Sequence, residues 1–579
     1  MHPRFPLISP LILALFACSS PASGDGRGTP VTTGGSAGTS AQGGSSAGGG
    51  SASIAGTGGS AGSSTGTGGV APIVCAPFTD PGATAPTSGL GNVVPLPVMS
   101  TLASGAFALA ASTGIYVEPN TPEMLAIGQY LADKLKPATG YALPVAATTA
   151  APCSGNIYLT TTNADSTLNA EGYALAIDPK LVRVSAPQPA GVFRGIQTVR
   201  QLLPASIEST TEQAGPWAIA AGTIRDFPRF SWRGVMLDVA RHFFGVPDVE
   251  KFIDVASFYK INTLHLHLSD DQGFRIAINS WPNLTTVGGS TEVDGGPGGF
   301  YTQADYSALV AFAKARYITI VPEIDMPGHT NAALASYANL NCNGQAPALR
   351  TDTAVGYSSL CVSSDTTYQF ASDVTREIAA LTPGAYLHLG GDEAKATSLD
   401  DFKTFFGKAA PLVQTAGKSL IGWDALGQLD SLPANAIVQY WTTADSARAA
   451  VAQHAKVLMS PANKAYMDMK YDMQTPFGQT WAGYITEQTG YEWDPATIVD
   501  GVGESDLVGL EAPLWTETLV KLADLEYMAY PRLAGYAEIG WSVADGRSWD
   551  EYKTRLATHG PRLRAWNVNF YQSDAIPWQ

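Results

Sequence analysis

The stretch Asn262-Thr-Leu-His-Leu-His-Leu-Ser-Asp-Asp271 joins a short apolar strand candidate to a pair of acids. Similar apolar runs, separated by helical periods, recur from Phe230 to the C-terminus. Eight such strands over about 350 residues predict a (β/α)8 barrel. The strands are expected at 235–239, 262–268, 318–323, 386–389, 419–423, 437–441, 455–459 and 508–515.

Polar and aromatic residues crowd the carboxyl ends of most of these strands. Barrel enzymes build their active sites at that end, from residues that follow each strand. We therefore expect an enzyme, and a surface sugar-binding lipoprotein on the same scaffold is the non-enzymatic alternative. The residues concerned are Asp238, Arg241, Asp270, Glu323, Asp325, Asp392, Glu393, Trp423, Trp441, Trp515 and Glu517.

A smaller domain is expected before the barrel. Short alternating runs are typical of strands, and helical periods fall between and after them. We expect an α+β domain over residues 75–225 and the catalytic barrel over 226–579. The small domain has no clustered acids, histidines or nucleophile motif, so we expect it to be structural. Its strands are expected at 114–117, 156–159 and 181–184, and its helices at 123–135 and 193–203.

The first 18 residues have the pattern of an export signal, with a basic start and an apolar run too short to span a bilayer. The sequence Leu15-Phe16-Ala17-Cys18 resembles a bacterial lipobox, in which Cys18 becomes the lipidated first residue. Residues 19–74 are mostly Gly, Ser, Thr and Ala, a composition typical of a flexible linker. We expect a cell-envelope lipoprotein whose only membrane contact is its lipid anchor, with ordinary secretion as the alternative.

Composition limits the partners. The 579 residues are 45% hydrophobic, which is enough for two or three domains with a sizeable core. Fifty acids against 34 bases give a net charge of -16, which repels phosphate backbones. Nucleic acid is therefore excluded as a partner, whereas the oligomeric state is left open.

Four cysteines follow Cys18, an even number that makes two disulfides plausible in an exported protein. Pairing nearest neighbours joins Cys342 to Cys361 and Cys75 to Cys153. No CxxC motif or Cys/His cluster indicates a metal site.

The histidines raise a rival hypothesis. His265 and His267 alternate onto one face of a strand, and such a pair can bind the metal of an amidohydrolase. That chemistry needs further histidines at later strands, and only His329 and His388 are available. Polar packing inside the barrel is the favoured interpretation of the pair. His329 follows the third strand in a loop with Pro and Gly, and there a role in the site is favoured.

Two carboxylates lie side by side in His388-Leu-Gly-Gly-Asp-Glu393. Glycosidases usually take their two carboxylates from separate segments, because the pair must flank the scissile bond at about 5 to 10 Å. Neighbours in a chain cannot flank it in that way. The tryptophans at 423, 441, 481 and 515 nevertheless favour a carbohydrate site, since aromatic faces pack against the C–H surface of a sugar.

Nine motifs follow one another along the chain: RDFPRFSWRGVMLDVARHFF, NTLHLHLSDDQGFRIAI, GGFYTQADY, ITIVPEIDMPGHT, YLHLGGDE, IGWD, QYW, AYMDMKY and LWTE. Together they resemble the β-N-acetylhexosaminidases of glycoside hydrolase family 20. The resemblance extends from about Ile224 to the C-terminus, and the preceding segment GVFRGIQTVRQLLP is similar to the family's N-terminal α+β domain.

The resemblance implies a role for the adjacent acids. In this family the nucleophile is the carbonyl oxygen of the substrate's own 2-acetamido group, so only one carboxylate has to reach the leaving oxygen. Glu393 would be the general acid and then the general base, and Asp392 would hold the acetamido N–H and stabilise the oxazolinium ion. Asp270 and His329 would lie beside Glu393 as a pair that tunes its protonation.

The resemblance also implies the sugar-binding residues. Arg241 and Glu517 would bind hydroxyls, Asp468 the far edge of the sugar and Tyr466 the acetamido oxygen. The walls of the acetamido pocket would be Trp423, Trp441 and Trp481, and Trp515 would stack under the ring.

The substrates implied are oligosaccharides or glycoconjugates, chitin oligosaccharides among them, that end in N-acetylglucosamine or N-acetylgalactosamine. No cofactor and no metal are implied. The sequence leaves the natural substrate open.

Overall fold

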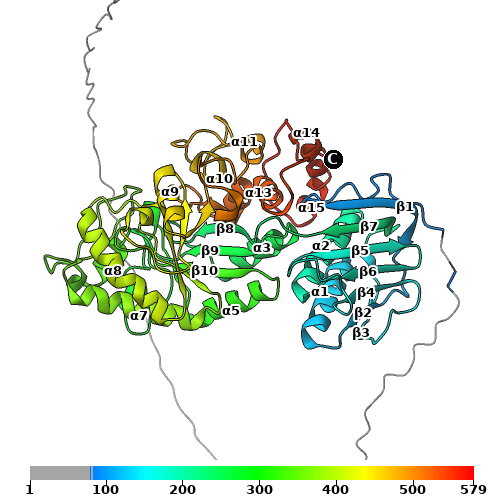
Figure 1. Ribbon diagram of the computed structural model, residues 1–579, viewed down its shortest axis with the longest axis horizontal. Coiled ribbons are helices and arrows are strands. Elements are labelled where there is room, and N and C mark those ends of the chain that lie inside the picture. The colour runs from blue at the N-terminus through cyan, green and yellow to red at the C-terminus, as the bar shows by residue number, and fades with distance from the viewer. Residues whose placement is uncertain (1–77, 80–81) are drawn as a thin grey trace, which may run out of the picture. The chain divides into compact units, whose positions relative to one another are not determined.

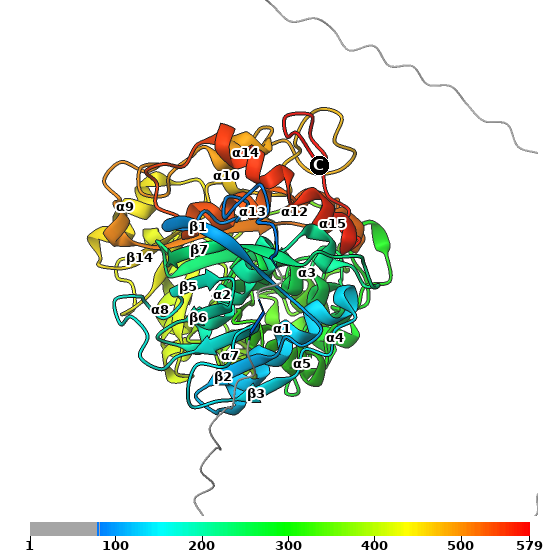
Figure 2. The same ribbon diagram turned by 90° about the vertical axis from the view of Figure 1, so that its right-hand side faces the viewer.

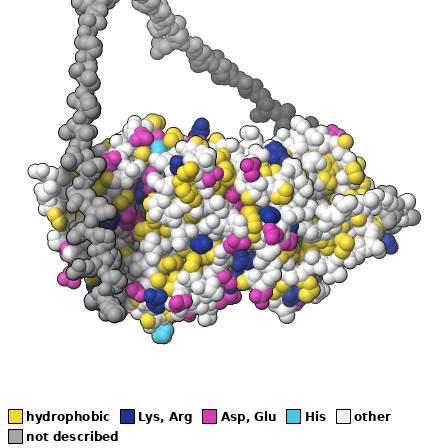
Figure 3. Space-filling view, turned by 90° about the horizontal axis from the view of Figure 1, so that it is seen from above, with side chains coloured by type: hydrophobic (Ala, Val, Ile, Leu, Met, Phe, Trp, Pro, Cys, Tyr) yellow, Lys and Arg dark blue, Asp and Glu magenta, His cyan; other side chains and the backbone are white. Residues whose placement is uncertain are grey.

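A computed structural model describes residues 78–79 and 82–579, which belong to one compact unit (Figure 1). The expected signal, the Gly/Ser linker, Cys18 and Cys75 lie outside the described residues. No helix in the described part is long and apolar enough to cross a membrane. On the face seen in Figure 3, acidic and basic side chains are interspersed.

The expected barrel is confirmed. Eight parallel strands close on themselves in the order β10-β11-β12-β13-β14-β15-β8-β9. They are β8 (Trp232–Asp238), β9 (Thr263–His267), β10 (Thr319–Glu323), β11 (Tyr386–His388), β12 (Ser419–Trp423), β13 (Ile437–Tyr440), β14 (Lys456–Met459) and β15 (Leu507–Leu514).

Only the start of β8 differs notably from the expected bounds, because it begins at Trp232 rather than Val235. Trp232 and Arg233 pair with Gly509 and Leu510 of β15, and Arg233 is fully buried in an ion pair with Glu171. A buried arginine interrupts the apolar pattern, so hydropathy does not reveal this part of the strand.

Helices surround the barrel (Figure 1). In α5, Thr302 and Asp305 form a capping box at the N-terminus, and Tyr306, Leu309 and Ala313 bury one face. The helices of the barrel half are α3 (Val246–Phe258), α4 (Asn283–Thr286), α5 (Gln303–Lys314), α6 (Asn331–Ser336), α7 (Asp365–Leu381), α8 (Leu399–Thr415), α9 (Ala444–Ala452), α10 (Ala462–Ala465), α11 (Glu487–Tyr491), α12 (Leu522–Ala529), α13 (Arg532–Trp541), α14 (Trp549–Ala557) and α15 (Gly560–Ala565). Short 3-10 turns are η2 (Val293–Gly295), η3 (Ala338–Leu340), η4 (Asp424–Gln428) and η5 (Glu504–Asp506).

The preceding domain is the expected α+β unit, built on a seven-stranded mixed sheet of order β1-β7-β5-β6-β4-β2-β3. Figure 2 views this sheet from the side away from the barrel. The strands are β1 (Met99–Ala108), β2 (Ile115–Glu118), β3 (Val145–Ala147), β4 (Asn156–Thr160), β5 (Tyr173–Asp178), β6 (Leu181–Ser185) and β7 (Ala218–Asp226); the helices are α1 (Pro122–Thr139), α2 (Pro189–Leu202) and the 3-10 turn η1 (Ala205–Glu208).

Buried charges join this domain to the barrel. Lys260 Nζ lies 3.0 Å from Asp226 Oδ2 and over the ring of Trp541, and all three side chains are fully buried. Glu171 accepts from both Arg194 and Arg233. Burial raises the pKa of Glu171, but the two guanidinium groups outweigh it and lower that pKa to about 2. These buried ion pairs lie at the contact between the N-terminal domain and the barrel.

The expected disulfide between Cys342 and Cys361 is present. It closes the loop that precedes α7, and this loop carries Thr353 and Val355 to the active-site pocket described below. The other expected pair stays a prediction, because Cys75 lies outside the described residues.

Candidate active site

A pocket of about 450 Å³ opens at the carboxyl ends of the barrel strands. None of its lining residues comes from the N-terminal domain. It is lined by Arg241, Thr353, Val355, Asp392, Glu393, Trp441, Thr442, Tyr466, Asp468, Gln479, Trp481, Trp515 and Glu517. Nine of these are residues expected from the sequence, and the other three expected residues, Asp270, His329 and Trp423, are buried. A larger hollow of about 980 Å³ beside α1 and α5 holds no comparable cluster of acids and tryptophans.

The segment after β11 places Asp392 and Glu393. Gly390 and Gly391 adopt positive φ angles of 65° and 96°, and Glu393 itself has a φ of 44°. A Cβ atom at Gly390 would lie 1.8 Å from Asp325 Oδ1, so only glycine fits there. The turn leaves the Asp392 side chain 12% exposed and the Glu393 side chain 26% exposed.

His329 lies between these carboxyl groups and Asp270. Its Nδ1 donates to Asp270 Oδ1 at 3.1 Å, and its Nε2 lies 3.7 Å from Glu393 Oε2 and 3.9 Å from Asp392 Oδ2. Burial lowers the pKa of His329, but the charge and hydrogen bond of Asp270 outweigh it and hold that pKa well above its usual value. The ring is therefore an imidazolium directed at both acids.

Asp270 is a carboxylate held by several cations. Its Oδ2 lies 2.9 Å from Arg241 Nη2 and accepts from His267 Nε2 at 2.8 Å. Burial raises the pKa of Asp270, but Arg241, followed by His329 and His267, holds it well below its usual range. A permanent negative charge thus keeps His329 protonated.

Asp392 has the opposite environment. Burial, together with the charges of Glu323 and Glu393, raises its pKa to about 6, against the attraction of His329. Asp392 can therefore hold a negative charge at neutral pH while being ready to interact with a developing cation.

Two acids line another part of the pocket. Asp468 is buried and the Glu517 side chain is 18% exposed, and burial with the charge of Glu517 raises the pKa of Asp468 well above its usual value. Asp468 Oδ1 and Glu517 Oε2 have no hydrogen-bond partner among the described residues. Arg241 lies 3.9 Å from Glu517 and over the ring of Trp515. These unpaired acceptors suit a ligand that brings its own hydroxyl donors.

Aromatic rings form the walls. Trp441 and Tyr466 lie nearly parallel at 6.3 Å between centroids, and Trp481 meets both edge-on. Trp481 is 57% exposed, so it lies at the mouth of the pocket. Trp423 is buried behind the pocket, 5.7 Å from Trp515, and its Nε1 donates to Glu323 at 2.8 Å.

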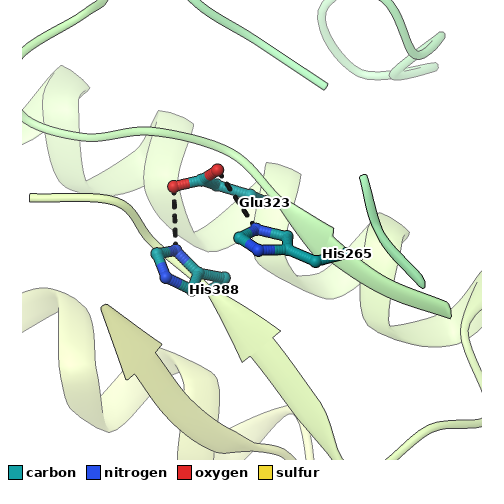
Figure 4. Close-up of side chains that lie close together, drawn as sticks. All are labelled: His265, Glu323 and His388. Atoms are coloured by element: carbon teal, nitrogen blue, oxygen red, sulfur yellow. Dashed lines mark ion pairs between the residues drawn. The ribbon is translucent and has the colours of Figure 1, made fainter. Parts of the chain in front are cut away.

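Beneath the pocket, His265 and His388 flank Glu323, as Figure 4 shows. His267 donates to the same carboxylate at 2.5 Å, and His265 donates to Glu511 at 2.8 Å. The groups are close enough to hold a metal ion. However, burial, which lowers the pKa of both His265 and His267, is outweighed by their carboxylate partners, which raise it to about 9 and about 10. The carboxylates and imidazolium groups of this cluster can therefore balance one another's charge, and polar packing inside the barrel stays the interpretation that we favour.

Several residues of the site were not predicted from the sequence, among them Thr442 and Gln479, which line the pocket. Lys395 Nζ lies 3.2 Å from Glu393 Oε1, and its place two residues after the acid could have indicated this contact. Thr353 and Val355 reach the pocket only because the disulfide loop folds over it. Asp325 stood out at the end of a strand, but no role was assigned to it.

Comparison with known proteins places this geometry in a family. The model for the catalytic domain of glycosyl hydrolase family 20 matches residues 230–544, and the model for domain 2 of that family matches residues 91–227. A β-N-acetylhexosaminidase of Cellulomonas fimi is 39% identical over 84% of this chain and 97% of its own length.

Solved structures agree. The family 20 β-N-acetylhexosaminidase of Streptomyces coelicolor A3(2) is 48% identical with a TM-score of 0.82, over 85% of this chain and 99% of that one. A Streptomyces plicatus N-acetyl-β-hexosaminidase in complex with Thio-NAglucal is 50% identical with a TM-score of 0.82, over 86% of this chain and 99% of that one.

Proposed function

This chain belongs to glycoside hydrolase family 20 as a β-N-acetylhexosaminidase, and we propose that it removes terminal N-acetylglucosamine or N-acetylgalactosamine with retention of configuration. The substrate's 2-acetamido oxygen acts as the nucleophile, through an oxazolinium intermediate. The substrates are oligosaccharides or glycoconjugates that end in such a sugar, chitin oligosaccharides included.

One observation carries this proposal. Asp392 and Glu393 both face the same imidazolium, His329, within 3.9 Å. The two carboxyl groups come from one turn and meet one nitrogen, whereas the usual pair comes from separate segments on opposite sides of the anomeric carbon. This arrangement supports a nucleophile supplied by the substrate itself, its acetamido carbonyl.

The first step follows from the positions of the acids. Glu393, the more exposed of the pair, donates its proton to the leaving oxygen while the acetamido oxygen attacks the anomeric carbon. Asp392 accepts a hydrogen bond from the acetamido N–H and stabilises the positive ring that forms. In the second step Glu393 takes a proton from water, which attacks the same carbon and releases the β-anomer.

The remaining residues bind the sugar. Asp468 and Glu517 accept from hydroxyls, Arg241 binds a hydroxyl beside them, and Trp515 stacks under the ring. Trp423, Trp441, Trp481 and Tyr466 enclose the acetamido group. Arg241, Asp468 and Trp515 are buried, so the hydroxyls they would bind belong to a sugar enclosed by the pocket, which supports binding of a chain terminus and exo action.

Proton NMR of the first product tests the mechanism. We expect the β-anomer of N-acetylglucosamine to appear first from an aryl β-glycoside. The initial appearance of the α-anomer would mean direct attack by water and would overturn the roles of Asp392 and Glu393. A matched β-glucoside with a 2-hydroxyl should be inert, because it lacks the nucleophile.

A further inference from the structure

Asp325 has no part in the mechanism above, yet it is packed tightly against the segment that carries Asp392. It follows β10, is 2% exposed, and its Oδ1 accepts from the Gly391 N–H at 3.0 Å. The same oxygen excludes any side chain at Gly390. Its own N–H donates to Ser269 Oγ at 3.2 Å. Asp325 is therefore held in one position beside the catalytic acids.

Asp325 belongs to one cluster with Asp392 and His329. Asp325 Oδ2 and Asp392 Oδ1 are both buried without a partner among the described residues, and so is His329 Nε2. One ligand atom from each of these three side chains lies within 4.8 Å of the others. Two buried carboxylates within this distance disfavour each other's charge, and a proton on one of them lets it donate a hydrogen bond to the other.

The charges around Asp325 and Asp392 favour one proton shared out to this pair of carboxyl groups, so that only one of them is ionised. Asp270 is matched by Arg241 and His329, and Glu323 by His265 and His267, whereas burial lowers the pKa of His388 so that this ring adds no charge. Glu393 has His329 and Lys395 beside it. Among the described groups, the His329 imidazolium is thus the cation that faces both Asp325 and Asp392. One cation does not balance two further carboxylates.

We propose that Asp325 is a positioning residue that remains a carboxylic acid at neutral pH and donates a hydrogen bond to the Asp392 carboxylate. Burial, followed by the charge of Asp392, raises the pKa of Asp325 well above its usual value. Burial raises the pKa of Asp392 to about 6, and the hydrogen bond from Asp325 opposes this rise, so that Asp392 is mostly ionised at pH 7. Asp392 Oδ1 is then occupied, so its other oxygen is free for the acetamido N–H. The inference rests on the role proposed for Asp392.

Asp325→Asn is the decisive variant. The amide oxygen still accepts from Gly391, and the amide nitrogen donates permanently to Asp392. We expect kcat/KM within about threefold of the wild type and the acidic limb of its pH profile at the same pH. If Asp325 were ionised, the substitution would remove a negative charge beside Asp392, and the acidic limb would move to lower pH by about one unit or more. That shift would overturn the proposal.

Asp325→Ala removes the donor. We expect kcat to fall by about 10- to 100-fold with a smaller change in KM, and the acidic limb to move to higher pH. Affinity for a thiazoline mimic of the intermediate should fall more than affinity for the product. Infrared difference spectra of the wild type minus Asp325→Asn at pH 7 provide a readout besides activity: they should show the loss of one carbonyl stretch of a protonated carboxyl group in the variant.

Controls separate the possible failures. Asp373→Asn, at a hydrogen-bonded aspartate on the outer helix α7, should change neither limb. If Asp392→Asn keeps full turnover, the proposed function itself fails. If Asp392→Asn is inactive and Asp325→Asn loses as much activity as Asp325→Ala, the proposed function stands and the proposal that Asp325 is protonated is refuted. Loss of wild-type activity on treatment with a chelator would place a cation, rather than a proton, between the three groups and would also overturn the proposal.

Discussion

Two clusters of ionisable groups lie at successive depths in the barrel. In the interior cluster, Glu323 faces His265, His267 and His388 and accepts from Trp423, while Glu511 accepts from His265, Trp232 and Gln439. In the pocket cluster, Asp325, Asp392, Asp468 and Glu517 each keep a buried oxygen without a partner among the described residues.

The carboxyl groups of the interior cluster have cationic partners within the protein, whereas those of the pocket cluster keep oxygens available for a ligand. Burial raises the pKa of Glu323, but its histidines outweigh burial and hold it well below its usual range. In the pocket, burial dominates and raises the pKa of all four carboxyl groups. Matched charges stabilise the barrel, whereas unmatched acceptors are unfavourable until a ligand supplies donors and developing positive charge.

The largest expected effect is on catalysis in the pocket cluster. Glu393→Gln cannot donate a proton, so turnover of an unactivated disaccharide should fall by about 10²- to 10⁴-fold. An aryl substrate with a good leaving group should lose less in the first step. Near wild-type rates on the disaccharide, measured by product release, would contradict the assignment.

In the interior cluster we expect a loss of stability. Glu323→Gln leaves the neighbouring imidazolium groups without their carboxylate, which should lower the free energy of unfolding by about 3–5 kcal/mol. Denaturant unfolding at pH 7 measures this change. An unchanged midpoint of unfolding would mean that Glu323 does not balance the charge of the neighbouring histidines. Asp468→Asn, the comparison variant in the pocket, should raise KM without a comparable loss of stability.

The pH dependence of stability should distinguish the pocket further. The pKa of Asp392 is raised to about 6 in the folded protein, from an ordinary value near 4. A raised folded pKa contributes stability that is fully present below the unfolded value and is lost as pH rises through 6. Asp392→Asn does not titrate, so relative to the wild type it should be more stable at pH 7 than at pH 4, by about 2–3 kcal/mol. Thermal unfolding of both proteins at the two pH values measures this difference, and an equal difference at both would refute the raised pKa.

A substitution in the N-terminal region should have the smallest effect on the activity and stability that depend on the two clusters. We propose that Cys18 carries a lipid anchor, since the preceding sequence resembles a lipobox. Cys18→Ala should release the protein from the membrane fraction and leave kcat/KM within about twofold. Soluble wild-type protein without an acyl chain, as seen by mass spectrometry, would refute the anchor.

The hydropathy pattern along the chain was enough to predict the barrel strands. The strand β1 and the start of β8 were not predicted, because contacts with residues distant in the sequence hold them. The barrel strands are short apolar runs that the sequence displays directly. β1 is largely exposed and rich in small residues, and it is held by pairing with β7 at the sheet edge. β8 begins at a buried arginine. Neither feature has a hydropathy signal, because both depend on a distant partner.

For the site, the sequence by itself indicated nine of the residues that line the pocket, through acids and tryptophans at strand ends, two adjacent carboxylates after two glycines, and motifs that resemble one family. Only the tertiary structure decided their charge states. Asp270 and His329 meet across 59 residues, and Asp325 meets the Gly391 N–H across 66. The protonation of a buried carboxyl group depends on such neighbours and on the loss of water around it, and neither is written in the adjacent sequence. A glutamate is thus a carboxylate paired with histidines at Glu323, whereas at Glu517 it keeps an oxygen without a partner among the described residues.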